Sequence, residues 1–278
     1  MHMKLGLTLS RLATALVAVV AIGAAQAAVT TVPQSALVAS DYYYTDLIGG
    51  GIGNVVVTTG GGNAANVGQA DGRNDDGFRF VNLGFNVNFF GNTYSSLYIN
   101  TNGNVSFGNG ISAYVPTGPT GANAPLISPF FGDVDTRNTA SGVVHVRTDV
   151  ANQIIVTWDN VGYYNLQGAP TNSFQLVLRG EDYGVPVGEG SIGFFYKDMG
   201  WERTATSTTA AVGFGDGQGN AKVLEGSNTA GLFPVLDNHH IWFDPNLNPV
   251  SQVPEPGALA LLGIGLLAGI GARARKSA

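Results

Sequence analysis

The stretch that decides the fold is FVNLGFNVNF, residues 80–89. Its odd-numbered positions, from Val81 to Phe89, are all apolar, and asparagine or glycine lies between them. Because successive side chains of a β-strand point to opposite faces, this alternation predicts a strand with one buried face. No stretch between 75 and 245 shows the period of an amphipathic helix. We therefore expect residues 80–89 to belong to a β domain.

Further strand candidates are short runs rich in β-branched and aromatic residues, separated by Gly, Asn, Asp and Pro. They lie at 97–99, 105–107, 143–147, 154–158, 174–179, 192–196, 210–214 and 241–243. Asn102-Gly103, between two of them, predicts a type I′ hairpin turn. Short strands at this spacing are typical of a sandwich or a barrel, and we expect an all-β, antiparallel, sandwich-like domain over residues 75–247.

Residues 28–74 carry a weaker pattern. Glycine triplets at 49–51 and 60–62 bracket one apolar run, Asn54 to Thr58. Glycine clusters favour loops, so we expect a glycine-rich irregular segment with at most one strand.

Composition excludes several classes of protein. Charged residues are 12% of the 278, about half of the usual ~25%. The chain has no cysteine, which excludes a disulfide scaffold and thiolate metal sites. The formal net charge is −6, so there is no positive excess for nucleic acid.

The first 27 residues have the layout of a secretory signal peptide. Lys4 and Arg11 precede an apolar run at 12–22, and Ala25 and Ala27 supply the small residues that a signal peptidase requires. We therefore expect export through the inner membrane.

The C-terminal residues 248–278 have three parts in a fixed order. They are Val253-Pro254-Glu255-Pro256, an uncharged run at 257–272, and the basic residues Arg273, Arg275 and Lys276. The run predicts a single apolar helix, and the positive-inside bias keeps its basic end in the cytoplasm.

This order resembles the PEP-CTERM sorting signal of Gram-negative bacteria. The resemblance implies transient insertion of 257–272 into the inner membrane and processing by an exosortase near Pro254-Glu255-Pro256. It also implies transfer to the cell surface or the extracellular matrix, often in species that make exopolysaccharide. A plain C-terminal membrane anchor is the alternative.

A second resemblance lies in the β region. Its motifs are FNVNFFG (85–91), LYINTNGNVSFG (97–108), APLISPFFGDVDTR (124–137), VTW (156–158), TNSFQLVL (171–178), FYKD (195–198) and VGF (212–214). Their order and spacing resemble the nidogen-like (NIDO) domain, although a Trp-Ala pair is common in that family where Phe131-Gly132 stands here. The resemblance implies an extracellular, non-enzymatic structural or adhesive module.

Asp133 and Asp135 are the candidate metal ligands. Side chains two apart on an extended segment share a face, and carboxylate oxygens suit Ca²⁺. Asn138 and Asp159 are candidates to complete the shell. The alternative interpretation is a structural cluster in which Arg137 pairs with the aspartates and their oxygens cap local turns.

Three other features bear on the chemistry of the chain. The acidic stretch DGRNDDG, residues 71–77, lacks the spacing of a calcium loop and predicts a solvated turn. Trp201 lies in a polar loop and is, if exposed, the candidate ligand contact. No sequence motif of a known catalytic site occurs.

The sequence thus predicts an exported surface or matrix protein that binds matrix polysaccharide or matrix proteins in a biofilm and is not an enzyme. A calcium-dependent carbohydrate-binding module is the first alternative, and a polysaccharide-acting hydrolase is the second, because paired carboxylates form in space. Removal of both terminal segments leaves 8 basic and 18 acidic residues, so the net charge becomes −10. This acidity favours neutral sugars or proteins as partners.

Overall fold

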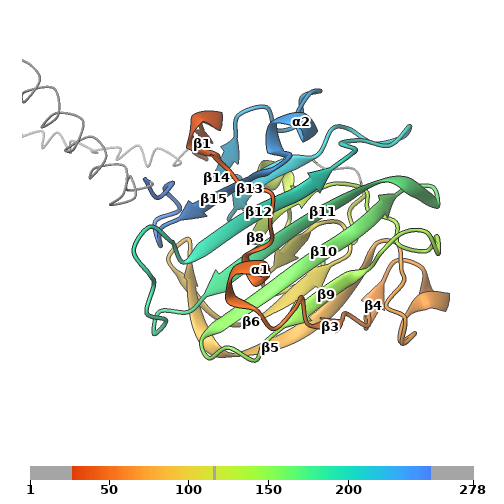
Figure 1. Cartoon of the computed structure of the whole chain (residues 1–278), viewed down its shortest axis with the longest axis horizontal. Coiled ribbons are helices and arrows are strands. Elements are labelled where there is room, and N and C mark those ends of the chain that lie inside the picture. The colour runs from red at the N-terminus through yellow and green to blue at the C-terminus, as the bar shows by residue number, and fades with distance from the viewer. Residues whose placement is uncertain (1–26, 115–116, 252–278) are drawn as a thin grey trace, which may run out of the picture.

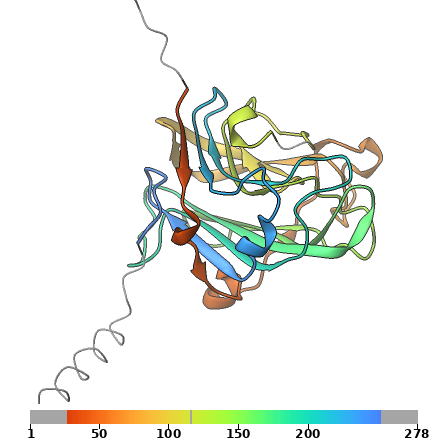
Figure 2. The same cartoon turned by 90° about the horizontal axis from the view of Figure 1, so that it is seen from above.

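A computed structural model describes residues 27–114 and 117–251, which form two β-sheets packed face to face (Figure 1, Figure 2). Fifteen strands make up the sheets in this part of the chain. They are β1 (Val29–Val32), β2 (Val38–Ala39), β3 (Asn54–Val55), β4 (Gly60–Gly61), β5 (Gly77–Phe89), β6 (Asn92–Asn100), β7 (Asn104–Ser106), β8 (Leu126–Phe131), β9 (Val144–Arg147), β10 (Gln153–Tyr163), β11 (Gln167–Arg179), β12 (Ile192–Met199), β13 (Ala211–Gly215), β14 (Ala221–Leu224) and β15 (His239–Phe243). The helices are short: α1 (Tyr44–Ile48), α2 (Phe233–Leu236) and the 3-10 turns Gln34–Ala36, Ala64–Asn66 and Pro119–Gly121.

The strand order separates the two layers clearly. The β5 sheet runs β1-β14-β13-β8-β7-β6-β5-β4, and the β10 sheet runs β2-β15-β12-β11-β10-β9-β3. Every named pair of strands is antiparallel except β1 with β14, which is parallel. The predicted all-β, antiparallel sandwich is therefore confirmed.

The core lies between the sheets and is rich in aromatic rings. Trp158 of β10 stacks on Phe174 of β11, with ring centroids 5.1 Å apart, and both are fully buried. The Trp158 indole donates to the carbonyl of Thr101 at 3.0 Å, so its polar atom is satisfied inside the core. Phe194 of β12 and Phe214 of β13 meet across the two sheets.

The alternation that predicts β5 is confirmed, because Val87 and Phe89 are buried while Asn86 and Asn88 are exposed. Strand β8 was not predicted. All six of its residues are buried, since it lies inside one sheet and both of its faces are covered, so no alternation marks it in the sequence.

Residues 28–74 form more regular structure than their glycines indicate. Strands β1, β2, β3 and β4 all come from this segment and pair with β14, β15, β9 and β5. Three of these strands have only two residues. A two-residue strand is too short to show a period, which explains why the sequence indicated at most one.

The turn between β6 and β7 differs from the predicted type I′ hairpin. Three residues, Thr101 to Gly103, connect the strands, and only Gly103 has a positive φ, +75°. Asn102 keeps a negative φ, and its buried amide bonds to other loops instead: Oδ1 accepts from the amide of Val134 at 3.0 Å. A Cβ on Gly103 would lie 1.8 Å from the carbonyl oxygen of Phe130, so only glycine fits.

The expected signal peptide and C-terminal helix lie outside the described residues, except that Ala27 is described and exposed. Ala25 and the sorting residues from Val253 to Lys276 are among those outside. Within 27–114 and 117–251, no helix has the length and apolar character needed to cross a membrane.

Candidate functional site

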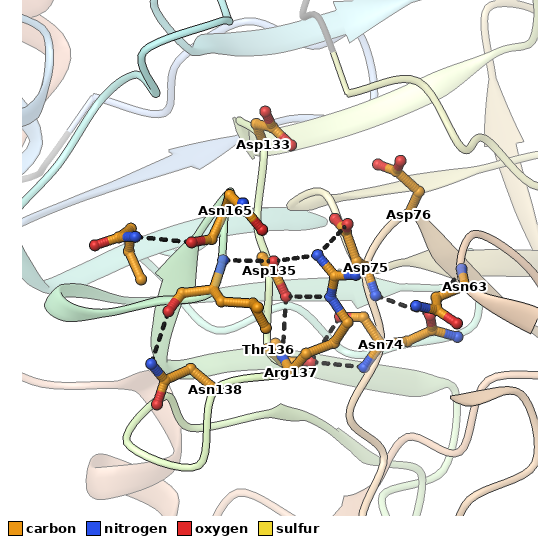
Figure 3. A network of polar contacts seen from close by, with 12 residues as sticks. Asn63, Asn74, Asp75, Asp76, Asp133, Asp135, Thr136, Arg137, Asn138 and Asn165 are labelled. Atoms are coloured by element: carbon orange, nitrogen blue, oxygen red, sulfur yellow. Dashed lines mark hydrogen bonds and ion pairs between the residues drawn. The ribbon is translucent and has the colours of Figure 1, made fainter. Parts of the chain in front are cut away.

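The loops at one end of the sandwich, where β4 is labelled in Figure 1, bring together acidic residues far apart in the sequence. Asp75 and Asp76 lie directly before β5, and Asp133 lies just after β8. An oxygen from each of these three carboxylates lies within 4.8 Å of the others. Figure 3 shows the three side chains turned toward a common space. We call this group the aspartate cluster.

Two members of the aspartate cluster are almost completely buried. Asp133 is 1% exposed and Asp75 is 8% exposed. Each has one oxygen with a partner: Asp133 Oδ2 accepts from Thr204 Oγ1 at 3.3 Å, and Asp75 Oδ2 pairs with Arg137 at 2.8 Å. The Oδ1 atoms of Asp75 and Asp133 are buried and have no hydrogen-bond partner in the structure. Such unsatisfied buried oxygens are costly and therefore rare.

The third member, Asp76, is partly exposed and has a left-handed backbone with φ of +59°. Asparagine and aspartate adopt this conformation more readily than other residues with side chains. Asn102 Nδ2 donates to Asp76 Oδ1 at 2.6 Å, so the β6–β7 turn fixes this carboxylate.

The segment that carries Asp75 and Asp76 is held in place by a buried neighbour, Asn74. Its side chain donates to Thr58 Oγ1 at 2.8 Å and accepts from the amide of Asp75 at 2.8 Å. Asn74 is fully buried. The expected solvated turn at 71–77 is therefore wrong for its second half, because Asn74 and Asp75 are buried and the carboxylates of Asp75 and Asp76 lie close to that of Asp133.

Asp135 differs from Asp133 in that both of its oxygens have partners within the fold. Strand β8 ends at Phe131, and beyond it Val134 and Asp135 form isolated antiparallel bridges with Tyr163 and Asp75. Asp135 accepts four hydrogen bonds: from Arg137 N at 3.0 Å, Nε at 2.9 Å and Nη2 at 2.6 Å, and from Leu166 N at 2.9 Å. Its two oxygens are thus used within the fold, as Figure 3 shows.

The other residues considered as ligands also bond elsewhere. Asn138 Oδ1 accepts from the amide of Ala140, and Asp159 Oδ1 accepts from the hydroxyl of Tyr43. Of the residues named from the sequence, only Asp133 belongs to the aspartate cluster. Asp135 and Arg137 form the salt bridge that the alternative interpretation expected.

Burial and mutual repulsion change the protonation of the aspartate cluster. Burial raises the pKa of Asp133 to about 7, and the charge of Asp76 adds to this shift. Burial also raises the pKa of Asp75 to about 7, with the charges of Asp135 and Asp76 acting in the same direction. The pKa of Asp76 is raised mainly by burial. The site thus disfavours three negative charges without a compensating cation.

A cavity of about 400 Å³ opens beside the cluster. Its lining is Asp76, Tyr114, Asp133, Tyr164 and Thr206. Tyr114 is 52% exposed and Tyr164 is 39% exposed, so both rings are accessible to a ligand. The amide of Tyr164 donates to the carbonyl of Asp133 at 3.1 Å, which holds the β10–β11 turn against the cluster. We call this cavity the aspartate pocket.

Trp201 does not lie at the surface. Its side chain packs between Phe130 and Tyr163, and the residue is 4% exposed. The indole Nε1 donates to the carbonyl of Val161 at 3.1 Å. A tryptophan in this environment fills the core, so the condition on which the ligand-contact prediction depended is not met.

Comparisons with known proteins agree with both resemblances. Residues 43–249 match the protein family described as NIDO related, and residues 252–276 match the PEP-CTERM protein-sorting motif. Together these features are those of a protein exported to the cell surface or extracellular space.

Individual relatives are distant. Alpha-tectorin of Mus musculus is 29% identical over 214 residues, which is 65% of this chain and 9% of that protein. Nidogen of Drosophila melanogaster is 27% identical over 227 residues, 63% of this chain and 16% of that protein. The match thus spans less than a fifth of the length of either relative. No solved structure matches the chain significantly. Because the family match covers most of the chain, the chain belongs to the NIDO-related family and carries a PEP-CTERM sorting motif directly after that domain.

Proposed function

We propose that the mature protein is a non-catalytic structural or adhesive component of a bacterial cell surface or extracellular matrix, where it binds exopolysaccharide. The observation that supports this most is the order of the two matched regions, a NIDO-related domain followed at once by the sorting motif at 252–276. The last strand in the described part of the chain, β15, ends at Phe243, so processing near residues 254–256 leaves all of the described strands intact. An exosortase of a Gram-negative host would perform that step.

The aspartate pocket is the proposed contact surface. Its two accessible tyrosine rings, Tyr114 and Tyr164, offer apolar faces with polar edges, which suits the mixed surface of a sugar. The processed chain has 18 acidic and 8 basic residues, so repulsion disfavours direct binding of anionic polymers. The proposed ligand is therefore a neutral polysaccharide.

A polysaccharide hydrolase is the second candidate function. The observation that favours it is a buried carboxyl group, Asp133, with its pKa raised to about 7 beside a second carboxylate, Asp76. A general acid next to a nucleophile has this arrangement in retaining glycosidases, where the two carboxyl groups are about 5–5.5 Å apart. The two functions differ in whether the sugar chain is cut.

Sorting is tested in cells that express the full chain, a chain lacking 253–278, or a chain with Pro254, Glu255 and Pro256 replaced by alanine. Fractionation and immunoblotting then follow the protein. We expect the full chain in the surface or medium fraction and both variants depleted there. Equal surface abundance of all three forms would overturn the sorting role.

Ligand contact is tested with neutral matrix polysaccharide immobilised on a column. Tyr114→Ala and Tyr164→Ala should weaken retention, because each removes one ring from the aspartate pocket. Phe80→Ala is the matched control, since Phe80 is 47% exposed and lies outside that pocket. Equal retention of all variants argues against the pocket, and release of reducing ends by the wild-type protein supports the hydrolase instead.

A further inference from the structure

The aspartate cluster has too few positive charges around it. Asp75, Asp76, Asp133 and Asp135 lie close together, and the ion pairs found within 27–114 and 117–251 give them one cation, Arg137. Arg137 contacts Asp75 and Asp135 and makes no ion pair with Asp76 or Asp133. Burying a carboxylate without a counter-charge is strongly unfavourable, so this excess of negative charge calls for another positive partner.

The unsatisfied oxygens are a second, independent sign. Asp133 is 99% buried, and its Oδ1 has no partner although it lies in the group that faces the common space of Figure 3. Asp75 Oδ1 is also buried without a partner. Thr204, from a neighbouring loop, donates a hydrogen bond to Asp133 Oδ2, whereas Asp133 Oδ1 receives none.

The distances suit one ion. Ca²⁺ binds carboxylate oxygens at about 2.3–2.6 Å, so two oxygens on the same ion are at most about 5 Å apart. One oxygen from each of Asp75, Asp76 and Asp133 satisfies this limit, since all three lie within 4.8 Å of one another. Their positions therefore need no large rearrangement to bind a single cation.

The ligand atoms also indicate which cation it is. The group consists of three carboxylates, without histidine, and the chain has no cysteine. All-oxygen sites favour hard cations such as Ca²⁺ and Mg²⁺ over Zn²⁺. Ca²⁺ accepts irregular geometry with six to eight ligands, whereas Mg²⁺ demands a near-ideal octahedron. The irregular loop origin of the three carboxylates favours Ca²⁺.

We propose that Asp75, Asp76 and Asp133 form a Ca²⁺ site at the floor of the aspartate pocket. Asp135 and Arg137 form the supporting ion pair beside it and are not ligands. Water from the aspartate pocket completes the coordination, because Asp76 and Asp133 line that cavity. The site goes beyond the proposed adhesive function and does not depend on it, since a cation here also joins the loops before β5 and after β8.

The test uses the processed chain, residues 28–251, stripped with EDTA and dialysed. Thermal unfolding is followed in EDTA, 10 mM CaCl₂ or 10 mM MgCl₂. For an extracellular site with Kd of roughly 0.1–1 mM, we expect Ca²⁺ to raise Tm by about 3–11 °C. Tb³⁺ emission excited through tyrosine, displaced by Ca²⁺, provides a second readout because Tyr114 and Tyr164 line the same cavity.

Variants locate the site. Asp133→Asn keeps the shape of the side chain, and it should weaken Ca²⁺ binding about tenfold or more, which removes about half or more of the Tm shift. Asp76→Asn, at a partly exposed position, gives the same information if Asp133→Asn does not fold. Asp182→Asn is the matched control, because Asp182 is exposed on the loop between β11 and β12.

The proposal is overturned if 10 mM CaCl₂ leaves the Tm of the wild-type protein unchanged and no Tb³⁺ emission appears. A shift that Asp133→Asn and Asp76→Asn both retain in full would place the ion elsewhere and overturn the site. An equal or larger shift with MgCl₂ would overturn the assignment to Ca²⁺. Binding of polysaccharide can succeed or fail in each case, so the two proposals are tested separately.

Discussion

Truncation of Trp201 tests whether this side chain supports the fold or contacts a ligand. Trp201→Ala empties a core position that is 4% exposed and removes two aromatic contacts, with Phe130 and Tyr163, each with ring centroids 5.3 Å apart. Truncating a buried tryptophan costs about 3–5 kcal/mol, and its two aromatic pairs, worth about 0.5–1.5 kcal/mol each, place Trp201 in the upper part of that range. We therefore expect a loss of about 4–5 kcal/mol in the free energy of unfolding.

Trp201→Phe separates packing from hydrogen bonding. In the wild-type protein the indole N–H donates to the Val161 carbonyl at 3.1 Å. Phenylalanine keeps an aromatic ring but has no N–H, so the Val161 carbonyl loses this donor. An unsatisfied buried group costs about 1–3 kcal/mol, so this variant should lie between alanine and wild type.

Urea unfolding of residues 28–251 measures both changes. With a slope of about 2 kcal/mol per M, the midpoint should fall by about 2 M for Trp201→Ala and about 1 M for Trp201→Phe. Val187→Ala is the control, since Val187 is 93% exposed and should unfold like wild type. A Trp201→Ala midpoint equal to that of the control would refute the core assignment of the indole.

Two further predictions concern pH and backbone. Burial lowers the pKa of His240, which stacks on Phe195, to about 4 from an ordinary 6.5, so the folded state binds fewer protons than the unfolded one between these values. Its contribution to stability is complete above pH 6.5 and falls by up to about 3 kcal/mol as the pH drops to 4. Urea midpoints at pH 4.5 and 7.5 should therefore differ less in His240→Phe than in wild type, and an equal difference in both proteins would contradict this. Gly103→Ala should prevent folding or lower the free energy of unfolding by several kcal/mol, because its Cβ would lie 1.8 Å from the carbonyl oxygen of Phe130. Gly91→Ala has a similar φ but open space around the added Cβ, so it should lower the free energy of unfolding by only about 1–2 kcal/mol. Similar urea midpoints for the two glycine variants would show that the close approach at Gly103 is wrong.

The sequence predicts the fold best where one face of a strand is buried and the other is exposed to solvent. In β5 the alternation from Val81 to Phe89 is visible because its asparagines face water. The same rule fails for β8, whose residues are all buried, and for the two-residue strands of segment 28–74, which are too short to carry any period. These segments become strands because of the strands with which they pair and pack, and a single sequence does not show which strands those are.

The candidate site is less predictable because it is assembled in space. Asp133 is named from the sequence, but the carboxylates facing it, Asp75 and Asp76, lie more than 50 residues earlier in a stretch expected to be solvated. Asp135, two residues from Asp133, lies nearby, but its oxygens are taken by Arg137 and by the amide of Leu166. Motifs defined by residue spacing along the sequence do not relate side chains that come from such distant loops.

The burial of Trp201 is also not predictable from the residues next to it in the sequence. Its neighbours in sequence, Gly200, Glu202 and Arg203, are polar or small, which is typical of a surface loop. The structure instead turns the indole inward, where Asn172 fixes the Trp201 backbone with hydrogen bonds at 2.9 and 3.0 Å. Local polarity predicts the exposure of a segment better than that of one large side chain in it.

The most direct test of the proposed function is co-sedimentation of the processed chain with insoluble matrix polysaccharide from the source cells, combined with an assay for released reducing ends. We predict that the wild-type protein moves to the pellet, that Tyr114→Ala and Tyr164→Ala move to it less, and that no reducing ends appear. A protein that stays in the supernatant would contradict the adhesive function. Polysaccharide that loses mass while reducing ends accumulate would contradict the non-catalytic one.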